Sequence, residues 1–371
     1  MRRNSETPSL GQIAAEASVS RAAVSMALRN HPRIPESTRK RIQEIANRLG
    51  WKPNPLLAEA MSAIRAGQPP VDRVTLAWVT TRNHRDGWKD SPFDLRCFHG
   101  ANARAENAGY RLEHFWVGDA NGNAHRLSEI LYNRGITGVL LAPLRDLSRF
   151  DLNWEHFASA TVAHTLIEPH LHRANDNHIG GSRVCVARLH GAGRRRIGLA
   201  IDERLDNRVE DLWTAGYLLE TFEEGLADPT LIHRPNAIHE AEFLRWVKAA
   251  KPDAIIGTQP GIPEWLNRAG YKVPEDIAYV SLDLATEDGS VAGIFQDAHS
   301  IGAAAIDMIA GQLLRHERGV PSIPKNTIIN GRWINGTTAP VSPPDSEYTR
   351  KAEILLSNSG STLPTRPVLF D

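Results

Sequence analysis

Short apolar segments alternate with helical patterns from residue 74 to about residue 315, and this alternation constrains the fold most strongly. The expected strands are VTLAWV, RLEHFWV, GVLLAP, ATVAHTL, RIGLAI, TLIHRP, DAIIGT and IAYVSLD. The expected helices span residues 97–108, 125–133, 180–191, 209–224, 238–250, 262–269 and 301–315. Such alternation predicts parallel sheets covered by helices. Eight units exceed one plain doubly wound sheet, so the alternatives are an eight-fold barrel or two adjoining α/β sandwiches.

The segment Leu10–Arg29 predicts two short amphipathic helices separated by a tight turn. Its first apolar residues, at positions 10, 13, 14 and 17, recur at i, i+3, i+4 and i+7. Ser18 and Val19 form the expected turn, and Ser20 is suited to cap the second helix. This pattern is typical of a helix-turn-helix that places its second helix in the major groove of DNA, with an ordinary helical hairpin as the alternative. The residues expected to point outward are Arg21, Ala22, Ser25, Met26 and Arg29.

A third helix is expected from Pro35 to Leu49, followed by Gly50 as a stop signal. Its basic residues, which are suited to contact phosphates, are Arg39, Lys40, Arg41 and Arg48. Residues 1–66 hold eleven lysines and arginines against five glutamates, whereas the whole chain is neutral with 43 basic and 43 acidic residues. A basic head on an acidic body is consistent with a module that binds a polyanion.

Proline pairs and small residues indicate the domain boundaries. The Pro53–Pro55 pair ends the headpiece, residues 56–66 have helical propensity without a long apolar face, and residues 67–70 form a Gly-Gln-Pro-Pro linker. We therefore expect a headpiece over 1–52, a hinge helix and linker over 53–70, a core over 71–340 and a flexible tail over 341–371. The tail is rich in Ser, Pro and Thr and lacks leucine heptads.

The cysteine content and the hydropathy pattern favour a cytoplasmic protein. Only Cys97 and Cys185 are present, and they form no CxxC pair or disulfide framework. No run of 18 apolar residues predicts a membrane span, and no apolar segment follows Arg2 and Arg3 as it would in an export signal.

From about Pro8 to Pro340 the chain resembles the LacI/GalR family of bacterial transcription regulators. The motifs that carry this resemblance are SLGQIAAEASVSRAAVSMAL, LGWKPNP, AENAGYRL, ITGVLLAP, HGAGRRRIGL and AGYKVPEDIAYVSLD. The resemblance implies a helix-turn-helix headpiece, a hinge helix and a periplasmic-binding-protein-like core of two α/β subdomains with parallel sheets. It also implies a homodimer, sometimes a tetramer, that binds operator DNA on the nucleoid and responds to a small effector, most often a sugar. No cofactor is expected.

The resemblance assigns base contacts to the second helix and a minor-groove wedge to the hinge. Arg21 and Ala22 occupy the positions that usually choose bases, and Met26 stands where the family often carries arginine. The usual leucine wedge falls on Ala60, which is too short, so Leu57 or Met61 is expected to act instead. The predicted DNA-binding residues are Ser20, Arg21, Ala22, Ser25, Met26, Arg29, Asn54, Leu57 and Met61.

The resemblance places the effector at loops after the strands, between the two subdomains. Ser91-Pro92-Phe93 matches the family's Asn-Pro-Phe, and Trp88 or Phe93 is expected to stack on a sugar ring. Trp213 stands where many members carry an arginine, with Arg208 nearby but offset, which favours a neutral sugar over a purine or an organic acid. The predicted effector residues are Trp88, Ser91, Phe93, Asp94, Arg208, Trp213, Thr258, Gln259, Asp283 and Gln296.

Other functional motifs are weaker. The histidines at positions 164, 170, 172 and 178 lie in one probable loop, but their spacing is not that of a metal site, so no metal is expected. No nucleophile motif indicates an enzyme. The main prediction is an effector-controlled transcription regulator, in particular a repressor. The alternatives are a sugar-binding or carbohydrate-processing protein with an accessory helical N-terminal domain, and an architectural DNA binder without effector.

Overall fold

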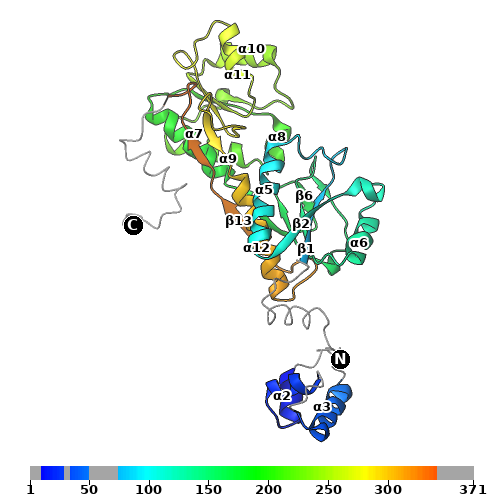
Figure 1. The fold of residues 1–371 in the computed structure, drawn as a ribbon. Helices are drawn as coiled ribbons and strands as arrows, with labels where there is room; N and C mark the ends of the chain where they lie inside the picture. Colours follow the sequence, from blue (N-terminus) through cyan, green and yellow to red (C-terminus); the bar gives the residue numbers. More distant parts are fainter. Residues whose placement is uncertain (1–9, 29–33, 50–73, 341–371) are drawn as a thin grey trace, which may run out of the picture. The chain divides into compact units, whose positions relative to one another are not determined.

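The computed structural model describes residues 10–28, 34–49 and 74–340 (Figure 1). The chain divides into two units, residues 1–73 and 74–371, which are described separately. The predicted hinge residues 53–70 and the predicted tail 341–371 lie outside the described residues.

The N-terminal unit contains three helices around a small apolar core. They are α1 (Leu10–Glu16), α2 (Arg21–Leu28) and α3 (Glu36–Leu49), each within one residue of its expected start. The core joins all three helices through Ile13, Val24 and Ile42, whose side chains are completely buried. Alanines at the remaining buried positions allow the short helices to approach one another closely. The expected apolar stripes are confirmed at positions 13, 14, 17, 24, 27, 42 and 46, whereas Leu49 is 36% exposed.

The second unit contains two lobes, each built on a six-stranded sheet. Lobe 1 has the strand order β13-β7-β5-β3-β1-β2 and is parallel throughout. Its strands are β1 (Val74–Thr80), β2 (Tyr110–Trp116), β3 (Gly138–Leu141), β5 (Ala158–Val162), β7 (His172–Asp176) and β13 (Asn326–Ile329), with the short pair β4 (Ser148–Arg149) and β6 (Leu166–Glu168) beside it. Its helices are α5 (Pro92–Asn107), α6 (Ala124–Asn133), α12 (Ala298–Leu314) and the short η1 (Val117–Ala120) and η2 (Trp154–His156).

Lobe 2 has the strand order β14-β12-β11-β10-β8-β9, and only its edge strand β14 is antiparallel. Its strands are β8 (Ile197–Ala200), β9 (Ile232–His233), β10 (Ala254–Gly257), β11 (Ala278–Ser281), β12 (Ala292–Phe295) and β14 (Arg332–Ile334). Its helices are α7 (His178–Gly191), α8 (Glu203–Asn207), α9 (Leu212–Glu223), α10 (Glu240–Ala250), α11 (Ile262–Arg268) and the short η3 (Pro229–Leu231).

Helices cover both faces of each sheet, as the period-two pleat of buried strands requires. In lobe 1, Leu76 and Trp78 of β1 join the cluster formed with α5 and α12, whereas Ala77 and Val79 join the cluster formed with α6. In lobe 2, one cluster involves α7 and α9 and the other involves α10 and α11. The fold is therefore two adjoining α/β sandwiches rather than a barrel.

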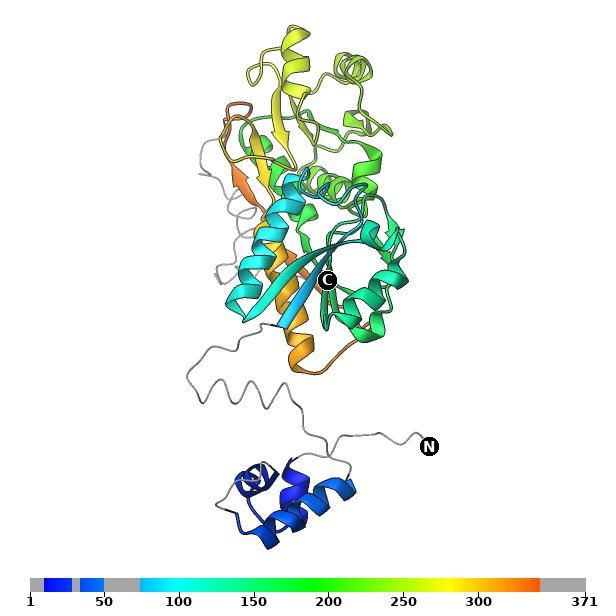
Figure 2. The same cartoon turned by 45° about the vertical axis from the view of Figure 1, so that its right-hand side comes forward.

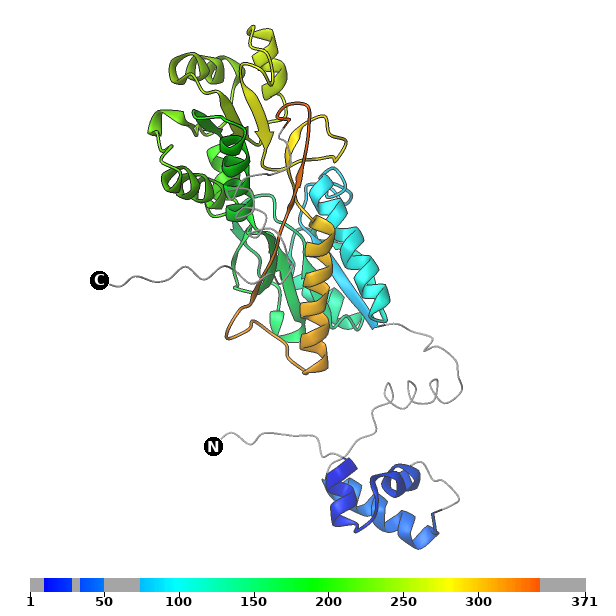
Figure 3. The ribbon, with the colours of Figure 1, turned by 90° about the vertical axis from the view of Figure 1, so that its left-hand side faces the viewer.

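The two lobes share their chain, because three segments cross between them. After β7 the chain enters lobe 2 through α7, after β12 it returns through α12, and from β13 it crosses again to β14. Helix α12 then lies beside α5 in lobe 1 (Figures 2 and 3). A Cβ atom on Gly302 of α12 would lie 2.0 Å from the carbonyl oxygen of Cys97, and one on Gly100 of α5 would lie 1.9 Å from that of His299. Only glycine permits this approach.

The strands that were not expected from the sequence are β4, β6, β7, β13 and β14, whereas β12 is the strand-like segment that precedes Gln296. No helix in the described part of the chain has both the length and the apolar character needed to cross a membrane.

The contact between α5 and α12 gives a stability prediction. Gly302→Ala forces the two helices apart and is expected to lower the free energy of unfolding of the full chain by about 1–3 kcal/mol. Gly311→Ala on the same helix is the matched control, because its added Cβ meets only the flexible end of Arg315 and improves helix propensity. Urea unfolding curves measure both; equal midpoints for Gly302→Ala and wild type would contradict the close-packing argument.

Candidate functional site

The turn between α1 and α2 has the geometry of a helix-turn-helix. Ser18 adopts a left-handed conformation with φ of 52°, and the amide of Val19 donates to the carbonyl of Ala14 over 3.0 Å. The Ser20 hydroxyl accepts a hydrogen bond from the amide of Ala23 at 3.2 Å, which confirms the expected cap of the second helix. The turn therefore sets the direction of α2 relative to α1.

The predicted base-reading surface lies on α2. Arg21 is exposed, and its guanidinium lies over Gly11 of α1, where an added Cβ would approach Nη2 to 2.8 Å. Met26 is half-buried, so part of it packs on the headpiece and part remains accessible. Ala22 and Ser25 belong to α2. Arg29 and the predicted hinge contacts Asn54, Leu57 and Met61 lie outside the described residues.

The basic residues of α3 divide into structural and accessible groups. Arg41 donates to the carbonyl of Ala17 over 3.2 Å, and Arg48 pairs with Glu16, so both tie α3 to the first helix. Lys40 is paired only within its own helix, to Glu36 at 3.0 Å, and both side chains are largely exposed. Lys40 is therefore the better placed of these three cations to contact a phosphate.

A second site lies where the two lobes meet, at the carboxyl ends of their strands, which is where open parallel sheets bind ligands. Three arginines bridge the lobes. Arg96 of α5 donates to the carbonyl of Ala285 at 3.0 Å, Arg208 donates to the carbonyl of Leu144 at 3.3 Å, and Arg173 of β7 pairs with Glu210 at 3.1 Å. These contacts hold polar side chains from both sheets close together.

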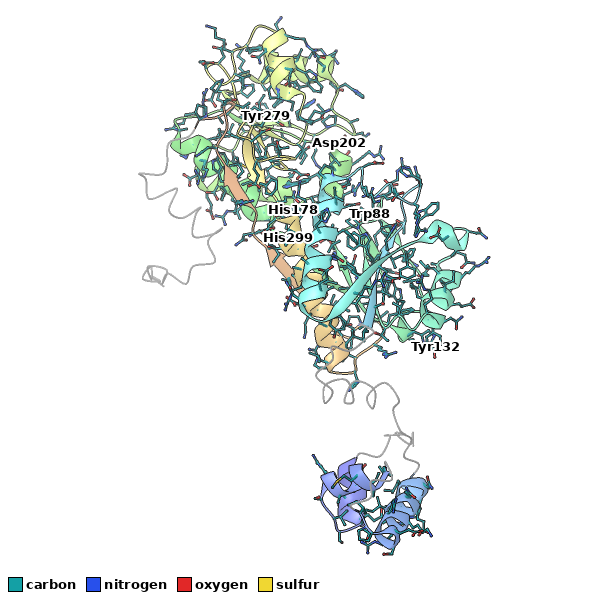
Figure 4. All side chains as sticks on the ribbon, in the orientation of Figure 1. Trp88, Tyr132, His178, Asp202, Tyr279 and His299 are labelled. Atoms are coloured by element: carbon teal, nitrogen blue, oxygen red, sulfur yellow. The ribbon has the colours of Figure 1, made fainter. Side chains whose placement is uncertain are left out.

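We define the interlobe cluster as His164, Asp176, His178, Glu210 and Asp283. His178, at the start of α7, lies between the two lobes (Figure 4). Its Nδ1 is 3.5 Å from Oδ2 of Asp176, and its ring is 5.6 Å from that of His164. Nδ1 of His164 is in turn 3.0 Å from Oε1 of Glu210.

Several polar atoms of this cluster are buried without a hydrogen bond inside the described protein. They are Oδ1 of Asp176 and Nδ1 of His178, and Oγ1 of Thr258 after β10 shares this property. A buried polar atom left unpaired costs about 1–3 kcal/mol. Groups of this kind at the carboxyl ends of strands are suited to bind a polar ligand.

The surroundings shift the protonation of these groups. Burial raises the pKa of Asp176 well above its usual value, and the carboxylates of Asp283 and Asp297 add to the shift. Burial lowers the pKa of His178 to about 3, with a smaller contribution from His164. Asp283 reaches solvent, yet the protein around it raises its pKa to about 6, against a smaller opposing effect of Arg96. Near pH 7 the histidines are neutral, so the cluster offers hydrogen-bond acceptors and no strong positive charge.

Four predicted effector residues lie in the first lobe. Trp88 is only 3% exposed and packs against Trp78, Phe98 and His114, so it is a core residue rather than the exposed stacking surface expected from the sequence. Ser91 caps α5 by accepting from the amide of Asp94 at 3.2 Å.

Asp94 and Phe93 also have structural contacts. The buried carboxylate of Asp94 accepts from Arg82 at 2.5 Å, and its pKa is raised because burial outweighs the attraction of that arginine. Phe93 is half-buried and packs on the cluster beneath α5 and α12. Asp94 and the nearby Arg208 interact electrostatically, which places both near the junction of the lobes.

The other predicted effector residues lie in the second lobe. Trp213 is buried, and the His178 ring lies 5.0 Å from it at 70°, so His178 lies against the indole that was expected to stack on a sugar. Gln259 accepts from the Tyr279 hydroxyl through its carbonyl at 2.8 Å, and Gln296 is buried directly after β12. The structure thus brings Asp283 and Arg208 to the junction, while it makes Trp213 part of the core.

The sequence interpretation missed Asp176 and considered His164 and His178 only as metal ligands. Within residues 10–28, 34–49 and 74–340, no three His, Cys, Asp or Glu side chains are grouped so as to hold a metal ion. These three residues could have been recognised from their positions at the ends of elements. His164 follows β5, Asp176 ends β7 and His178 begins α7.

A surface cavity of about 330 Å³ lies away from the junction, beside α6 and η2. It includes Tyr132, which is 4.5 Å from the ring of His156. Its lining residues carry none of the unpaired buried atoms that characterise the interlobe cluster, so we do not assign it the same role.

Sequence comparison identifies both parts of the chain. Residues 9–54 match the family described as bacterial regulatory proteins, lacI family, and residues 186–338 match the periplasmic binding protein-like domain. The chain therefore combines a LacI-family DNA-binding domain with a periplasmic binding protein-like domain. None of the curated proteins compared with this chain matches it in sequence.

Solved structures of similar fold are transcription regulators. The complex of the transcriptional regulator CelR with cellobiose is 19% identical, with a TM-score of 0.55, and the match covers 90% of this chain and 100% of CelR. The lac repressor dimer bound to operator and the anti-inducer ONPF is 16% identical, with a TM-score of 0.53 and coverage of 91% and 100%. The CCPA regulator from Weissella paramesenteroides with bound glucose is 16% identical, with a TM-score of 0.53 and coverage of 72% and 98%. At these identities the likeness establishes the fold.

The buried carboxylate of Asp176 gives a prediction on pH and stability. Its pKa is higher in the folded than in the unfolded chain, so wild-type stability falls as the pH rises through the folded-state pKa. Asp176→Asn removes this loss of stability at high pH, because asparagine does not ionise. We expect the variant to be more stable than wild type by about 1–3 kcal/mol at high pH, with the difference shrinking toward acid.

Thermal unfolding at a series of pH values measures this difference. Asp151→Asn serves as the control, because it removes an exposed carboxylate instead of a buried one. A difference in stability between Asp176→Asn and wild type that does not depend on pH would contradict the raised pKa of Asp176.

Proposed function

We propose that this LacI-family chain is a transcription repressor whose headpiece binds operator DNA under the control of a small carbohydrate bound between the lobes. The observation that carries the proposal is the interlobe cluster, where unpaired buried atoms of Asp176 and His178 face the junction of two lobes joined to a helix-turn-helix headpiece. The role is regulatory and involves no catalytic step.

DNA binding is supported by the geometry and charge of the headpiece. The capped second helix presents Arg21, which is suited to donate two hydrogen bonds to guanine in the major groove. Ala22 and Met26 are proposed to contact the methyl groups of thymine. One headpiece reads only a few base pairs, so we propose a homodimer on a near-palindromic operator in the bacterial nucleoid.

A neutral carbohydrate is supported by the chemistry of the interlobe cluster. Aspartate carboxylates accept hydrogen bonds from sugar hydroxyl groups, and the neutral histidines can accept or donate one. Burial lowers the pKa of both His164 and His178, so neither imidazole supplies a positive charge near pH 7, and Arg173 is already paired with Glu210. The named ligands of CelR and of the CCPA regulator, cellobiose and glucose, belong to the same chemical class.

The base-reading role of Arg21 is tested by substitution. Arg21→Ala is expected to abolish the preference for operator over random DNA while weak, salt-sensitive binding remains, because phosphate contacts are retained. Lys40→Ala is the matched control and should weaken binding to both DNAs alike. Fluorescence anisotropy on operator and scrambled duplexes measures both; equal losses for Arg21→Ala on the two duplexes would show that Arg21 does not read bases.

The effector class is tested by calorimetric titration of the full chain with neutral sugars and with anionic metabolites. Asp283→Asn is expected to weaken binding of the best sugar by roughly tenfold to a hundredfold, because it replaces a charged acceptor by a neutral one. Asp151→Asn, at an exposed residue of lobe 1, should bind as wild type does. Micromolar affinity for an anionic metabolite, with none for sugars, would contradict the proposed class.

The alternative of a sugar-binding or carbohydrate-processing protein is tested by gel shift against flanking genomic DNA. If specific binding is absent, and deletion of residues 1–66 leaves the biological activity unchanged, the regulatory proposal fails. Sequencing of the bound genomic fragments then identifies the operator.

A further inference from the structure

Helix α9 is apolar on both of its faces. Its inner face is buried against α7 and the lobe 2 sheet through Trp213, Gly216 and Tyr217. Its outer face carries Ala215, Leu218, Leu219 and Phe222, which recur at i, i+3, i+4 and i+7 and are all exposed. The exposed fractions are 46% for Leu218, 43% for Leu219 and 77% for Phe222.

A helix that is apolar all round is normally buried all round. Single exposed leucines are ordinary, but four contiguous apolar positions on one helix face indicate a binding surface. None of the residues that the structure describes covers this face, so its partner is either a part of the chain outside the described residues or another molecule. We call Ala215, Leu218, Leu219 and Phe222 the α9 outer face.

The C-terminal segment of the same chain starts close to this helix. Ala339 belongs to the same hydrophobic cluster as Trp213 and Tyr217. The Thr338 carbonyl accepts from the amide of Tyr279 at 2.9 Å, and the Tyr217 hydroxyl donates to the carbonyl of Ile197 at 2.8 Å. Ile197 and Ala278 both align with Ala254, at the amino ends of their strands. The contacts of Tyr217 and Thr338 are therefore at the same end of the sheet.

The sequence of that segment fits the α9 outer face. The longer apolar run in residues 341–371 is Ala352-Glu353-Ile354-Leu355-Leu356, directly after Arg350 and Lys351, whereas the second run, Val368-Leu369-Phe370, has only three residues. The α9 outer face ends beside Glu223, which pairs with Arg183 at 3.0 Å but keeps 38% of its side chain exposed, so a further cation can approach it. The twelve Cα–Cα steps from Pro340 to Ala352 span up to about 40 Å when extended, which is ample to reach a helix of the same lobe.

We propose that residues 350–356 pack on the α9 outer face of their own chain. The apolar run covers Leu218, Leu219 and Phe222, while Arg350 and Lys351 lie near Glu223. Attachment to the lobe at Ala339 gives the segment a millimolar effective concentration, which favours it over a free partner. This role for the C-terminal segment is independent of the effector proposal.

Disulfide trapping in the full chain tests the contact. The double variant Leu219→Cys with Leu355→Cys is expected to form a disulfide on mild oxidation, because the two side chains are held together. The pair Tyr132→Cys with Leu355→Cys is the control, since Tyr132 is 55% exposed but lies on α6 of lobe 1, and it should not form one. The native Cys97 and Cys185 are completely buried, so the added thiols are the ones that react.

Mixing isotope-labelled and unlabelled protein before oxidation identifies which chain supplies the segment. The proposal predicts linked peptides from one isotope only. Mixed-isotope links would show that a second copy occupies the face, and equal linking of the Tyr132 control would show a segment without a fixed site; either result overturns the proposal.

Hydrogen exchange gives a second readout that needs no added cysteine. Deletion of residues 341–371 is expected to speed amide exchange in α9 by about fivefold or more, and Leu355→Asp with Leu356→Asp should do the same. Leu363→Asp, in the same segment but outside the apolar run, should leave exchange unchanged. Exchange in α9 that none of these variants alters would also overturn the proposal.

Discussion

The contact between α5 and α12 determines how the two lobes can be arranged. Helix α12 follows β12 of lobe 2 yet packs on lobe 1, and its approach to α5 is possible because Gly100 and Gly302 lack side chains. Close packing of this kind fixes the helix that carries the chain back from lobe 2. The strand ends that form the interlobe cluster therefore meet in a defined way, although they come from segments far apart in the sequence.

The interlobe cluster has an energetic cost that a ligand can offset. Asp176 and His178 belong to the segment that leaves lobe 1, whereas Asp283 follows a strand of lobe 2. A ligand that forms hydrogen bonds with residues of both lobes stabilises the arrangement of the lobes that fits it. It does not stabilise other arrangements of the lobes. If that arrangement also affects how two headpieces are presented to DNA, the ligand and the operator are coupled, which is the proposed basis of regulation.

Sequence patterns identified the headpiece and most central strands, because buried runs such as VTLAWV are apolar on both faces. They did not identify β7, since HRAND is polar, and its buried Asn175 and Asp176 are placed by the sheet and the junction rather than by hydrophobicity. Trp88 and Trp213 show the opposite difficulty. Trp88 was expected to contact ligand from its place in the loop after the first strand, and Trp213 from its match to a family position. Each is instead buried by aromatic or histidine neighbours that no local pattern reveals.

The central claim is that carbohydrate bound between the lobes changes the affinity of the headpiece for operator DNA. Linkage requires that the effect be reciprocal, so the most direct measurement is the affinity of the full chain for its sugar with and without saturating operator. We expect the sugar affinities with and without operator to differ by about 5- to 150-fold. The operator affinities measured with and without sugar should differ by the same factor. Equal sugar affinities in the presence and absence of operator would contradict it.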